Sequence, residues 1–389
     1  MRKALLLSGM ILFFISAFAQ RSKPLNLILD QQEISVIMKT AQVYLFTPPL
    51  TVATSQCPRS SGGANDYYSE GDYWWPDPKS AQGPYIQRDG ESNPDNFVAH
   101  RQALFRLTNI VGTLTSAYLL TGTAQYEKVI EKHLNAWFIE PKTRMNPNML
   151  YSQAIKGKFT GRSIGIIDAI HLIEVARSVK ILHDTRVVNE AVYSGVKRWF
   201  SEFLEWMFTH PYGIEEMNAK NNHGTCWVEM AAAFADLTGD SAKLEFCRQR
   251  FKEVLLPGQM APDGSFPLEI KRTKPLGYSL FNLDAMAVIC KILSTPSDDL
   301  WRYTTSDGRN MEKGIAWMFP FVADKTKWPF PKDIMYWDEW PVRNPFLLLG
   351  GQALHQPNYL SLYKSLKHDF KVYEVIRNVP VRHPLLWKD

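Results

Sequence analysis

The sequence lacks the motifs by which many enzymes hold a metal ion or a nucleotide. Its four cysteines, Cys57, Cys226, Cys247 and Cys290, show no CxxC or Cys/His spacing, so no zinc site is expected. No glycine-rich nucleotide-binding loop is present either. Three of the four cysteines lie inside apolar helical patterns, where a buried thiol behaves as a small hydrophobic group. We therefore expect no essential disulfide, although an exported protein could form one.

The sequence also has little net charge. Lys and Arg exceed Asp and Glu by only five, and no basic run is interleaved with aromatic residues. This pattern argues against nucleic acid as a partner but is compatible with a local basic cleft for a polyanion. Twelve Trp and sixteen Tyr are many for this length. Exposed aromatic rings commonly bind sugars, whereas buried ones pack in the core.

The first residues have the pattern of an export signal. Arg2 and Lys3 precede an apolar run from Leu5 to Phe14, and Ala17-Phe18-Ala19 is a small-x-small cleavage site. The run is shorter than the ~20 residues of a membrane-spanning helix, which disfavours the alternative of a membrane anchor. We expect cleavage after Ala19 and a single mature domain, residues 20–389. The location is then periplasmic or secreted, without membrane contact, and the oligomeric state stays open.

Helical periodicity dominates from about residue 100 onward, and strand-like alternation is scarce. Stop signals such as Thr121-Gly122-Thr123 and Leu237-Thr238-Gly239-Asp240 separate the periodic segments. Helices are expected at Leu25–Phe46, His100–Thr121, Ala124–Phe138, Ser163–Leu182, Val187–Thr209, Cys226–Leu237, Ala242–Leu255, Leu276–Leu293 and Leu300–Phe319. Helical hairpins in this number bury their apolar faces when they close into a ring. We predict an all-α fold, an incomplete (α/α) toroid of about six to seven helical hairpins.

A long loop from Pro48 to Asn96 lies between the first two predicted helices and is rich in Tyr, Trp, Asp and Asn. Loops of this length are usually functional or disordered, and the aromatic content argues against disorder. We predict that this loop lies over the cleft of the toroid.

Two short segments about fifty residues apart carry side chains suited to removing a proton next to a carboxylate. They are Asn221-Asn222-His223 and the stretch from Arg272 to Tyr278. β-Elimination from a 4-linked uronate requires an enzyme to neutralise the C6 carboxylate, take the C5 proton and protonate the leaving O4. Asn222 and Arg272 suit the first task. A histidine such as His223 can act as base or carboxylate partner, and Tyr278 can protonate O4.

The positions of these residues suggest how they could meet. Asn222-His223 precedes a predicted helix, where Asn is a favoured cap and the helix N-terminus attracts anions. Arg272 and Tyr278 enter another predicted helix, and a nearby Arg272 is expected to lower the pKa of Tyr278 enough for it to act as a base too. Each element alone is weak, because an isolated Asn-His pair is most often a cap and an Arg near a Tyr most often makes a structural hydrogen bond.

Several segments resemble the alginate lyase superfamily of helical-toroid polysaccharide lyases, in the expected order over roughly residues 55 to 345. They are Met145–Gln153, Gly161–Asp168, Asn221–His223 and Asp263–Arg272 with Tyr278, and, as in a branch of uronan lyases from gut and marine bacteria, Ser69–Pro78 and Ser92–His100. The resemblance implies metal-independent β-elimination without a cofactor, acting on alginate or a related acidic polysaccharide. It assigns the carboxylate to Asn222 and Arg272, and proton transfer to His223 and Tyr278.

The stereochemistry of the substrate divides the labour between these residues. Where the C5 proton and O4 lie on the same face, Tyr278 could be both base and acid. Where they lie on opposite faces, His223 would be the base and Tyr278 the acid. The sequence leaves the choice of mannuronate, guluronate or glucuronate open, and with it endo or exo action.

Further residues are candidates for binding the substrate. Tyr73, Trp74 and Trp75 could stack on sugars or form a lid, and His100 could face the cleft, although packing and helix capping are their alternatives. Gln153 and Arg162 could hold neighbouring carboxylates, although Arg162 could equally brace the loop by a salt bridge. A last aromatic and basic set at the rim comprises Tyr336, Trp337 and Arg343.

Other functions stay open at this point. A glucuronan lyase would use the same residues on a different epimer. A glycoside hydrolase would need two carboxylates flanking the bond, and Asp66, Asp72, Glu229 and Asp263 are not paired by a recognisable motif. A non-catalytic uronan-binding protein would use the aromatic residues alone. The complete Asn/His/Arg/Tyr set favours a lyase.

Overall fold

The computed structural model describes residues 29–80 and 82–388, so the predicted export signal and the start of the first predicted helix lie outside the described residues. An inner layer of helices packs side by side along the chain. It comprises α3 (Ala99–Thr121), α5 (Leu172–Asp184), α8 (Asn222–Thr238), α12 (Pro275–Leu293) and α14 (Pro345–Ala353). Each is followed by an outer helix, namely α4 (Ala124–Leu134), α6 (Glu190–Thr209), α9 (Ser241–Arg250), α13 (Met311–Ala323) and α15 (Pro357–Ser365).

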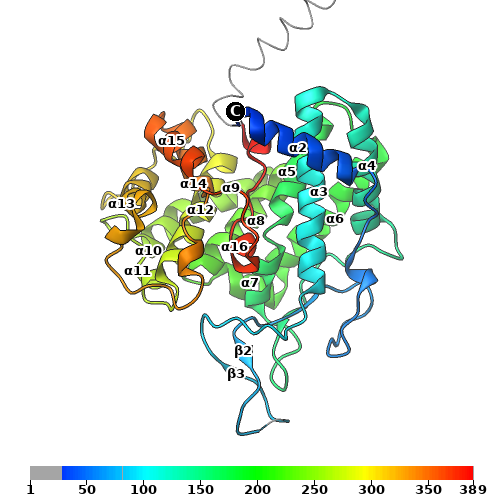
Figure 1. Cartoon of the computed structure of the whole chain (residues 1–389), viewed down its shortest axis with the longest axis horizontal. Coiled ribbons are helices and arrows are strands. Elements are labelled where there is room, and N and C mark those ends of the chain that lie inside the picture. Colours follow the sequence, from blue (N-terminus) through cyan, green and yellow to red (C-terminus); the bar gives the residue numbers. More distant parts are fainter. Residues whose placement is uncertain (1–28, 81, 389) are drawn as a thin grey trace, which may run out of the picture.

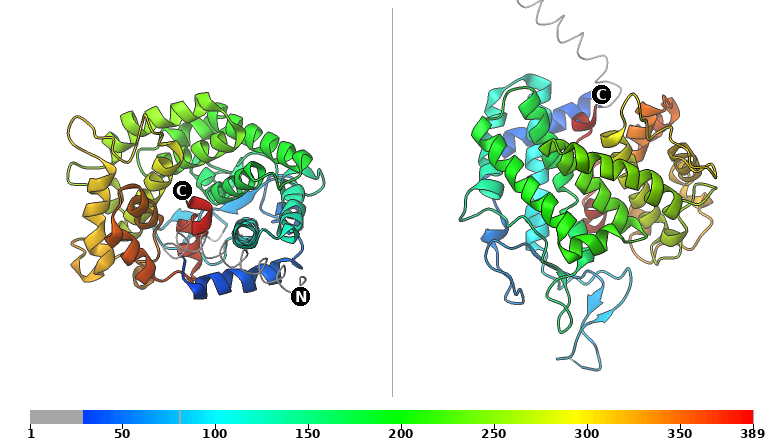
Figure 2. Two further views of the ribbon diagram at one scale, coloured as in Figure 1. Left: turned by 90° about the horizontal axis from the view of Figure 1, so that it is seen from above. Right: turned by 180° about the vertical axis from the view of Figure 1, so that it is seen from behind.

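Seen from above, these helices curve into a ring (Figure 2). Helix α2 (Gln31–Tyr44) packs against α3. The predicted all-α (α/α) toroid is confirmed. The described residues contain five complete hairpins plus α2, whereas the sequence predicted about six to seven.

Local signals explain where many helices begin and end. Asp30 and Glu33 form a capping box at the start of α2. Gly122 and Gly239 adopt the left-handed conformation that ends α3 and α8, at the stop signals recognised in the sequence. Asn189 caps α6 by accepting a hydrogen bond from the Ala191 amide.

Four predicted helices differ in detail. The helix expected from Leu300 begins only at Met311, where Asn310 caps α13. The helix expected from Ser163 splits into a 3-10 helix, Ser163–Ala169, and α5. The fourth turn of the Ala124 helix is a π-helix, Asn135–Ile139, and so is the end of the Ala242 helix, Phe251–Leu255. Shorter helices that periodicity missed are α7 (Pro211–Met217), α10 (Leu256–Gln259), α11 (Pro267–Ile270) and α16 (Tyr373–Asn378).

The hydrophobic core lies between the two helical layers and inside the ring. Helices α8 and α12 are almost entirely buried. Helix α12 is long and apolar enough to cross a membrane by length and composition. However, 89% of its apolar 18-residue stretch is buried inside the protein, as in a core helix. All four cysteines are buried free thiols in the structure.

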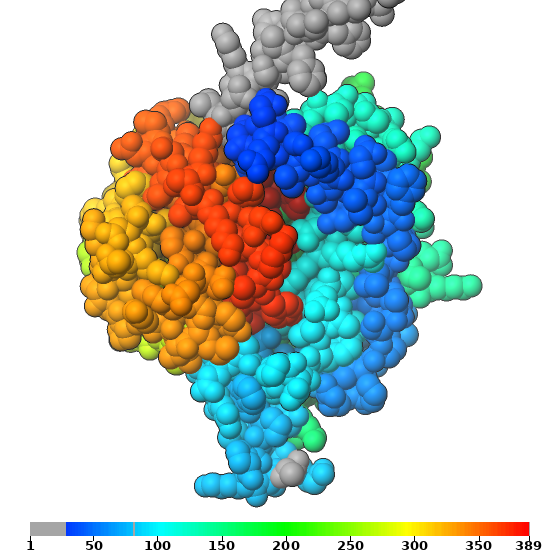
Figure 3. Space-filling model, viewed as in Figure 1, coloured from blue at the N-terminus to red at the C-terminus, as the bar shows by residue number. Residues whose placement is uncertain are grey.

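The segment from Pro48 to Asn96 is mostly loop, as predicted, and one part of it forms a projecting hairpin. Strands β2 (Trp74–Trp75) and β3 (Ile86–Gln87) pair antiparallel, and β1 (Tyr68–Glu70) pairs parallel with β4 (Tyr151–Ala154). The β2–β3 hairpin leaves the helical body at the end opposite α2 (Figure 1). We call this hairpin with its flanking residues (72–91) the arm, and it stands out in the space-filling view (Figure 3).

Buried ion pairs tie the base of this arm to the toroid. Asp72 pairs with Arg101 of α3 at 2.8 Å and with Arg377 of α16 at 2.8 Å. Arg101 also pairs with Asp168 at 2.8 Å. Because removing one partner would leave an uncompensated buried charge, this network holds Tyr73, the next residue, in a defined place.

Candidate active site

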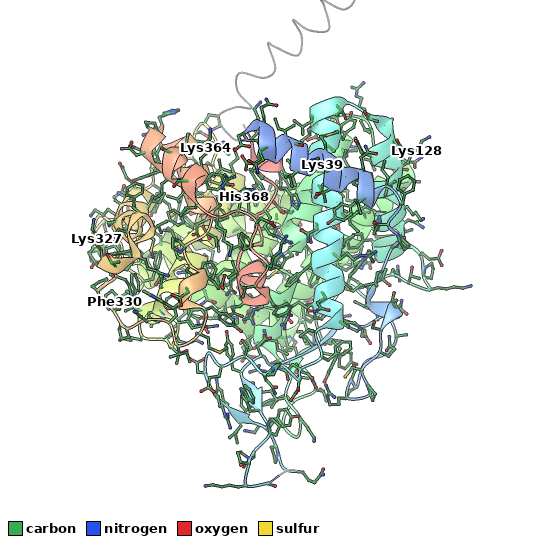
Figure 4. All side chains as sticks on the ribbon, viewed as in Figure 1. Lys39, Lys128, Lys327, Phe330, Lys364 and His368 are labelled. Atoms are coloured by element: carbon green, nitrogen blue, oxygen red, sulfur yellow. The ribbon has the colours of Figure 1, made fainter. Side chains whose placement is uncertain are left out.

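The four predicted catalytic side chains line one cavity, where the base of the β2–β3 hairpin meets the toroid. Asn222 and His223 open α8, Arg272 follows α11, and Tyr278 lies in the first turn of α12. Tyr73, Trp74, Gln153 and Arg162 line the same cavity, as do Asp72, Gln87, Asp89, Ile164, Ile167, Asp168, Phe281, Arg377 and Asn378. Residues far apart in sequence thus meet because two helices start at the same rim. Lys128 and Lys327, by contrast, lie at opposite sides of the helical body, away from the hairpin (Figure 4).

A buried carboxylate orients His223. Nδ1 of His223 lies 2.6 Å from Oε1 of Glu216, a residue of α7 that is only 1% exposed. Burial raises the pKa of Glu216, and the nearby imidazole partly offsets this effect. Since Nδ1 is engaged, Nε2 is the ring nitrogen left for chemistry in the cavity.

Glu269 on α11 holds Asn222 in a similar way. The backbone N–H of Asn222 donates to Oε1 of Glu269 at 2.7 Å, and its side-chain Nδ2 donates to Oε2 at 2.7 Å. Asn221, not Asn222, is the N-cap residue of α8, and its side chain makes no capping bond. An amide nitrogen carries two hydrogens, so Asn222 keeps one to donate into the cavity.

Arg272 is held by a residue of the hairpin and lies against Tyr278. Its Nε and Nη2 contact the two oxygens of Asp89 at 3.3 and 2.8 Å. Its guanidinium lies 4.5 Å from the centre of the Tyr278 ring. A fixed cation therefore stands beside the phenol, an arrangement suited to binding a carboxylate near a proton donor.

The Tyr278 hydroxyl donates to the Tyr73 hydroxyl at 3.0 Å, and Nζ of Lys274 donates to the same Tyr73 oxygen at 2.9 Å. Burial raises the pKa of Tyr278 well above its usual range, and Tyr73 adds to this, while Arg272 lowers it. The sequence predicted that Arg272 would lower the pKa of Tyr278 overall. That prediction was wrong because burial outweighs the nearby cation. Tyr278 is a neutral phenol, fit to donate a proton.

Arg162 also brings a guanidinium to the cavity, as Arg272 and Arg377 do. Its Nε donates to the Gln153 carbonyl at 2.9 Å, and its charge lies 5.7 Å from the Trp74 ring centre. No ion pair joins Arg162 to a carboxylate within the part of the chain that the structure describes, and burial lowers its pKa to about 10. Gln153 has φ 47 and donates from Nε2 to Asp168 at 3.2 Å, which braces it at the cavity wall.

Five predicted binding residues are not in the cavity lining. His100 is buried between the Tyr68 amide and the Ser55 carbonyl, at 2.9 and 2.7 Å, so its role is to hold the loop. Arg343 is buried, pairs with Glu33 and donates to the carbonyls of Leu366 and Lys364.

The other three are aromatic. Nε1 of Trp75 donates to the Glu91 carbonyl at 2.9 Å, within the arm. The ring centre of Tyr336 lies 5.4 Å from Nζ of Lys274, which places Tyr336 beside the site but outside its lining. Trp337, the third member of that rim set, has Lys325 4.8 Å from its ring centre. Sequence patterns could not separate these rings from cavity-facing ones.

Several residues of the site escaped the sequence analysis. Glu269 and Asp168 lie within the family-like segments and could have been found there. Glu216 lies seven residues before His223, on the preceding helix, and this closeness in sequence is only a weak signal. No sequence signal marked Asp89 or Lys274, because their contacts join segments that are distant in the chain.

The carboxylates considered for glycoside hydrolysis do not form a catalytic pair. Asp72 is held by Arg101 and Arg377, and Glu229 is buried in α8. Asp66 accepts from Asn146, and Asp263 accepts from the Ser265 amide. Of these four, Asp72 is the one in the cavity lining.

Known proteins match this chain in family and in fold. The alginate lyase family matches residues 51–328. The crystal structure of an alginate lyase from Bacteroides ovatus is 32% identical, covers 90% of this chain and 92% of its own, and superposes with a TM-score of 0.79. Alginate lyase A1-III from Sphingomonas species A1 shares the fold at 15% identity, with 83% of this chain and 88% of its own covered and a TM-score of 0.52.

A variant of alginate lyase A1-III complexed with a tetrasaccharide also shares the fold, at 15% identity and a TM-score of 0.56 over 85% of this chain and 88% of its own. Among curated proteins, none matches the sequence. The family match covers most of the described chain, and the fold agrees with it. The chain therefore belongs to the alginate lyase family and is a polysaccharide lyase.

Proposed function

We propose that this lyase cleaves 1,4-linked polyuronate of the alginate type by metal-independent β-elimination. The observation that carries the proposal is the single cavity in which Asn222, His223, Arg272 and Tyr278 meet, with the cation of Arg272 4.5 Å from the Tyr278 ring centre. Arg272 and Asn222 bind the C6 carboxylate and stabilise the charge that develops on it when the C5 proton leaves. The alginate lyases with the same fold support the choice of polymer.

The bond changes follow from this arrangement. The base takes the C5 proton, the C–H electrons form the C4–C5 double bond, and the C4–O4 bond breaks. Tyr278 gives its proton to the departing oxygen, which becomes the hydroxyl of a new reducing end. The other product carries a 4,5-unsaturated uronate. Because burial raises the pKa of Tyr278, the phenol holds its proton until the oxygen departs and can give it then.

The base depends on the sugar. His223, held at Nδ1 by Glu216, presents Nε2 and suits a proton on the face opposite O4. For a proton on the same face as O4, Tyr278 must act as both base and acid. It must then first lose its proton: the Tyr73 oxygen, 3.0 Å away, can accept it while Tyr73 gives its own proton to the Glu374 carboxylate at 3.4 Å.

Arg162 gives the cavity a second place for a carboxylate. Every unit of a polyuronate carries one, so a chain that places one carboxylate on Arg272 presents another on the adjacent sugar. We assign that carboxylate to Arg162, with the Trp74 ring beside it as a surface for a sugar.

The test is to incubate the purified protein with polymannuronate, polyguluronate and glucuronan, and to follow the ultraviolet absorbance of the unsaturated product. Activity on mannuronate or guluronate blocks supports the proposal, and activity on glucuronan alone would make the protein a glucuronan lyase. New reducing ends without a rise in absorbance would contradict β-elimination. Binding without any product would point to a uronan-binding protein.

Tyr278→Phe tests the acid directly. The change removes one hydroxyl and its bond to Tyr73 while the ring stays packed against Arg272. Turnover should fall by about 10²-fold or more, the usual contribution of a general acid, with an unchanged melting temperature. Turnover at the level of the unmodified protein would remove Tyr278 from the mechanism.

We also propose that the enzyme works outside the cytoplasm, on the basis of the export pattern ending at Ala19. Expression of the full chain in a Gram-negative host, followed by cell fractionation and N-terminal sequencing, tests this. A mature protein beginning at Gln20 in the periplasm or medium is expected. Uncleaved protein in the cytoplasm would contradict it.

A further inference from the structure

The carboxylate of Asp89 occupies a corner formed by two successive residues, Arg272 and Thr273. Besides the two contacts from Arg272, Oγ1 of Thr273 donates to Oδ2 of Asp89 at 3.0 Å. Gly90, which follows Asp89 in the chain, has a φ of +79°, and a Cβ there would lie 2.4 Å from Oγ1 of Thr273. Only glycine permits this approach without strain, so the end of the hairpin is shaped to seat Asp89 in the corner.

The contact uses one edge of the guanidinium and leaves another. A guanidinium carries five N–H donors and can bind a carboxylate along the edge formed by Nε and one Nη, or along the edge formed by both Nη atoms. Asp89 takes Nε and Nη2. Among the described residues, no contact uses either hydrogen of Nη1 or the second hydrogen of Nη2, so these donors can bind a second carboxylate.

The same arm also contacts the acid. Tyr73, just before β2, receives the hydrogen bond from Tyr278, and Asp89, just after β3, holds Arg272. The two strands pair with each other through Trp74 and Gln87, so the two contacts are mechanically joined. One hairpin therefore sets the position of both the proton donor and the cation beside it.

We propose that Asp89 is a positioning residue for the elimination, which fixes Arg272 by one edge so that its other edge meets the C6 carboxylate beside Tyr278. This inference rests on the proposed function. Asp89 touches no reacting atom and acts through Arg272. Its negative charge also offsets part of the positive charge of Arg272. The contact therefore orients the guanidinium but does not increase its attraction for the substrate carboxylate.

Two other roles for Asp89 predict different kinetics. If Asp89 competed with the substrate for Arg272, its removal would lower KM and leave kcat equal or higher. If it only fastened the arm, its removal would lower the melting temperature and leave kcat per folded molecule unchanged. A positioning role predicts a loss in kcat with KM equal or lower, because the freed charge still attracts the polyanion.

The experiment compares Asp89→Asn with Glu91→Gln as a matched control. Glu91 is an exposed carboxylate two residues further on, and its side chain makes only a 4.0 Å ion pair with Arg88 within the described chain. Both variants lose one negative charge from the same arm. The measurements are kcat and KM on the best uronan, with melting temperatures.

For Asp89→Asn we expect kcat to fall about 10- to 100-fold, because a small misplacement of a group at the reacting centre has an effect of this order. Glu91→Gln should behave as the unmodified protein, and Asp89→Glu, which keeps the charge, should recover part of kcat. Unchanged kcat in Asp89→Asn, with or without a lower KM, would overturn the inference while the unmodified enzyme stays active. If the unmodified enzyme yields no unsaturated product on any uronan, the proposed function itself fails and the inference falls with it.

Discussion

Glu216 offers a substitution whose effects on activity and on stability should have opposite signs. It is buried on α7, and one oxygen contacts Nδ1 of His223 at 2.6 Å. Its other oxygen has no hydrogen-bond partner within the described structure. Glu216→Gln keeps the shape of the side chain and removes its charge, so it tests what the charge contributes.

The loss in activity can be estimated from the bond that the charge strengthens. A hydrogen bond to a charged group contributes about 1.5–3 kcal/mol. At 1.36 kcal/mol for each factor of ten in rate, this corresponds to a decrease of about 10- to 150-fold in kcat/KM, if His223 must be held in one orientation and gains charge during proton transfer. The effect should be largest on the substrate for which His223 is the base.

The effect on stability follows from the raised pKa of Glu216. A carboxyl whose pKa is higher in the folded than in the unfolded protein adds stability at low pH, and this is lost as pH rises from about 4.3, the ordinary value for Glu, through the folded-state pKa. At a pH above the folded-state pKa the buried charge therefore opposes folding. A neutral Gln removes that penalty, so the melting temperature should stay equal or rise.

The assay is the initial rate of absorbance increase on mannuronate-rich and guluronate-rich polymers, together with thermal unfolding at pH 5 and pH 7.5. The control is Glu215→Gln, which removes a charge from the adjacent, exposed position of the same helix. Activity of Glu216→Gln within about twofold of the unmodified protein on every active substrate would refute the orienting role. A large fall in melting temperature would show that Glu216 is structural.

Two further predictions concern other buried charges. Arg162→Gln should raise KM by about 10- to 100-fold, which corresponds to the loss of one charge-assisted hydrogen bond. The melting temperature should stay equal or rise, because the guanidinium is largely buried without a carboxylate partner in the described chain. An unchanged KM in steady-state kinetics would show that no uronate carboxylate binds there. Asp284 in α12 is fully buried, and burial raises its pKa to about 8. The stability it adds is present below about pH 4 and is lost as pH rises from there to about 8, with a slope of about 1.4 kcal/mol per pH unit for one proton. Asp284→Asn should flatten the decrease in unfolding free energy between pH 5 and pH 7.5 in urea titrations, and an identical decrease would assign it to other groups such as Glu229, whose pKa burial also raises.

The sequence by itself determined the class of fold and pointed to candidate catalytic side chains that line one cavity. Apolar residues at helical spacing must be buried on one face, and this requirement is local, so α3, α6 and α12 could be predicted within a few residues. Stop signals at Gly122 and Gly239 are local too. Asn222, His223, Arg272 and Tyr278 could be selected because their chemistry fits one reaction and because they resemble a family.

Only the tertiary structure decided how these side chains are held. Asp89 meets Arg272 across 183 positions and Tyr73 meets Glu374 across 301, and no periodicity in the sequence encodes such pairs. The same applies to Arg343, a basic residue near aromatic rings in sequence that is buried against Glu33.

Burial is the physical reason that the two levels differ. The pKa of a phenol or carboxyl depends on all the atoms around it, so a cation nearby in sequence does not decide the outcome. In Tyr278 burial raises the pKa despite Arg272, and in Asp284 it raises the pKa despite hydrogen bonds from Asn344 and Phe346. The sequence thus predicted the candidate reacting groups, while the packed structure decides through burial how readily each of them loses its proton.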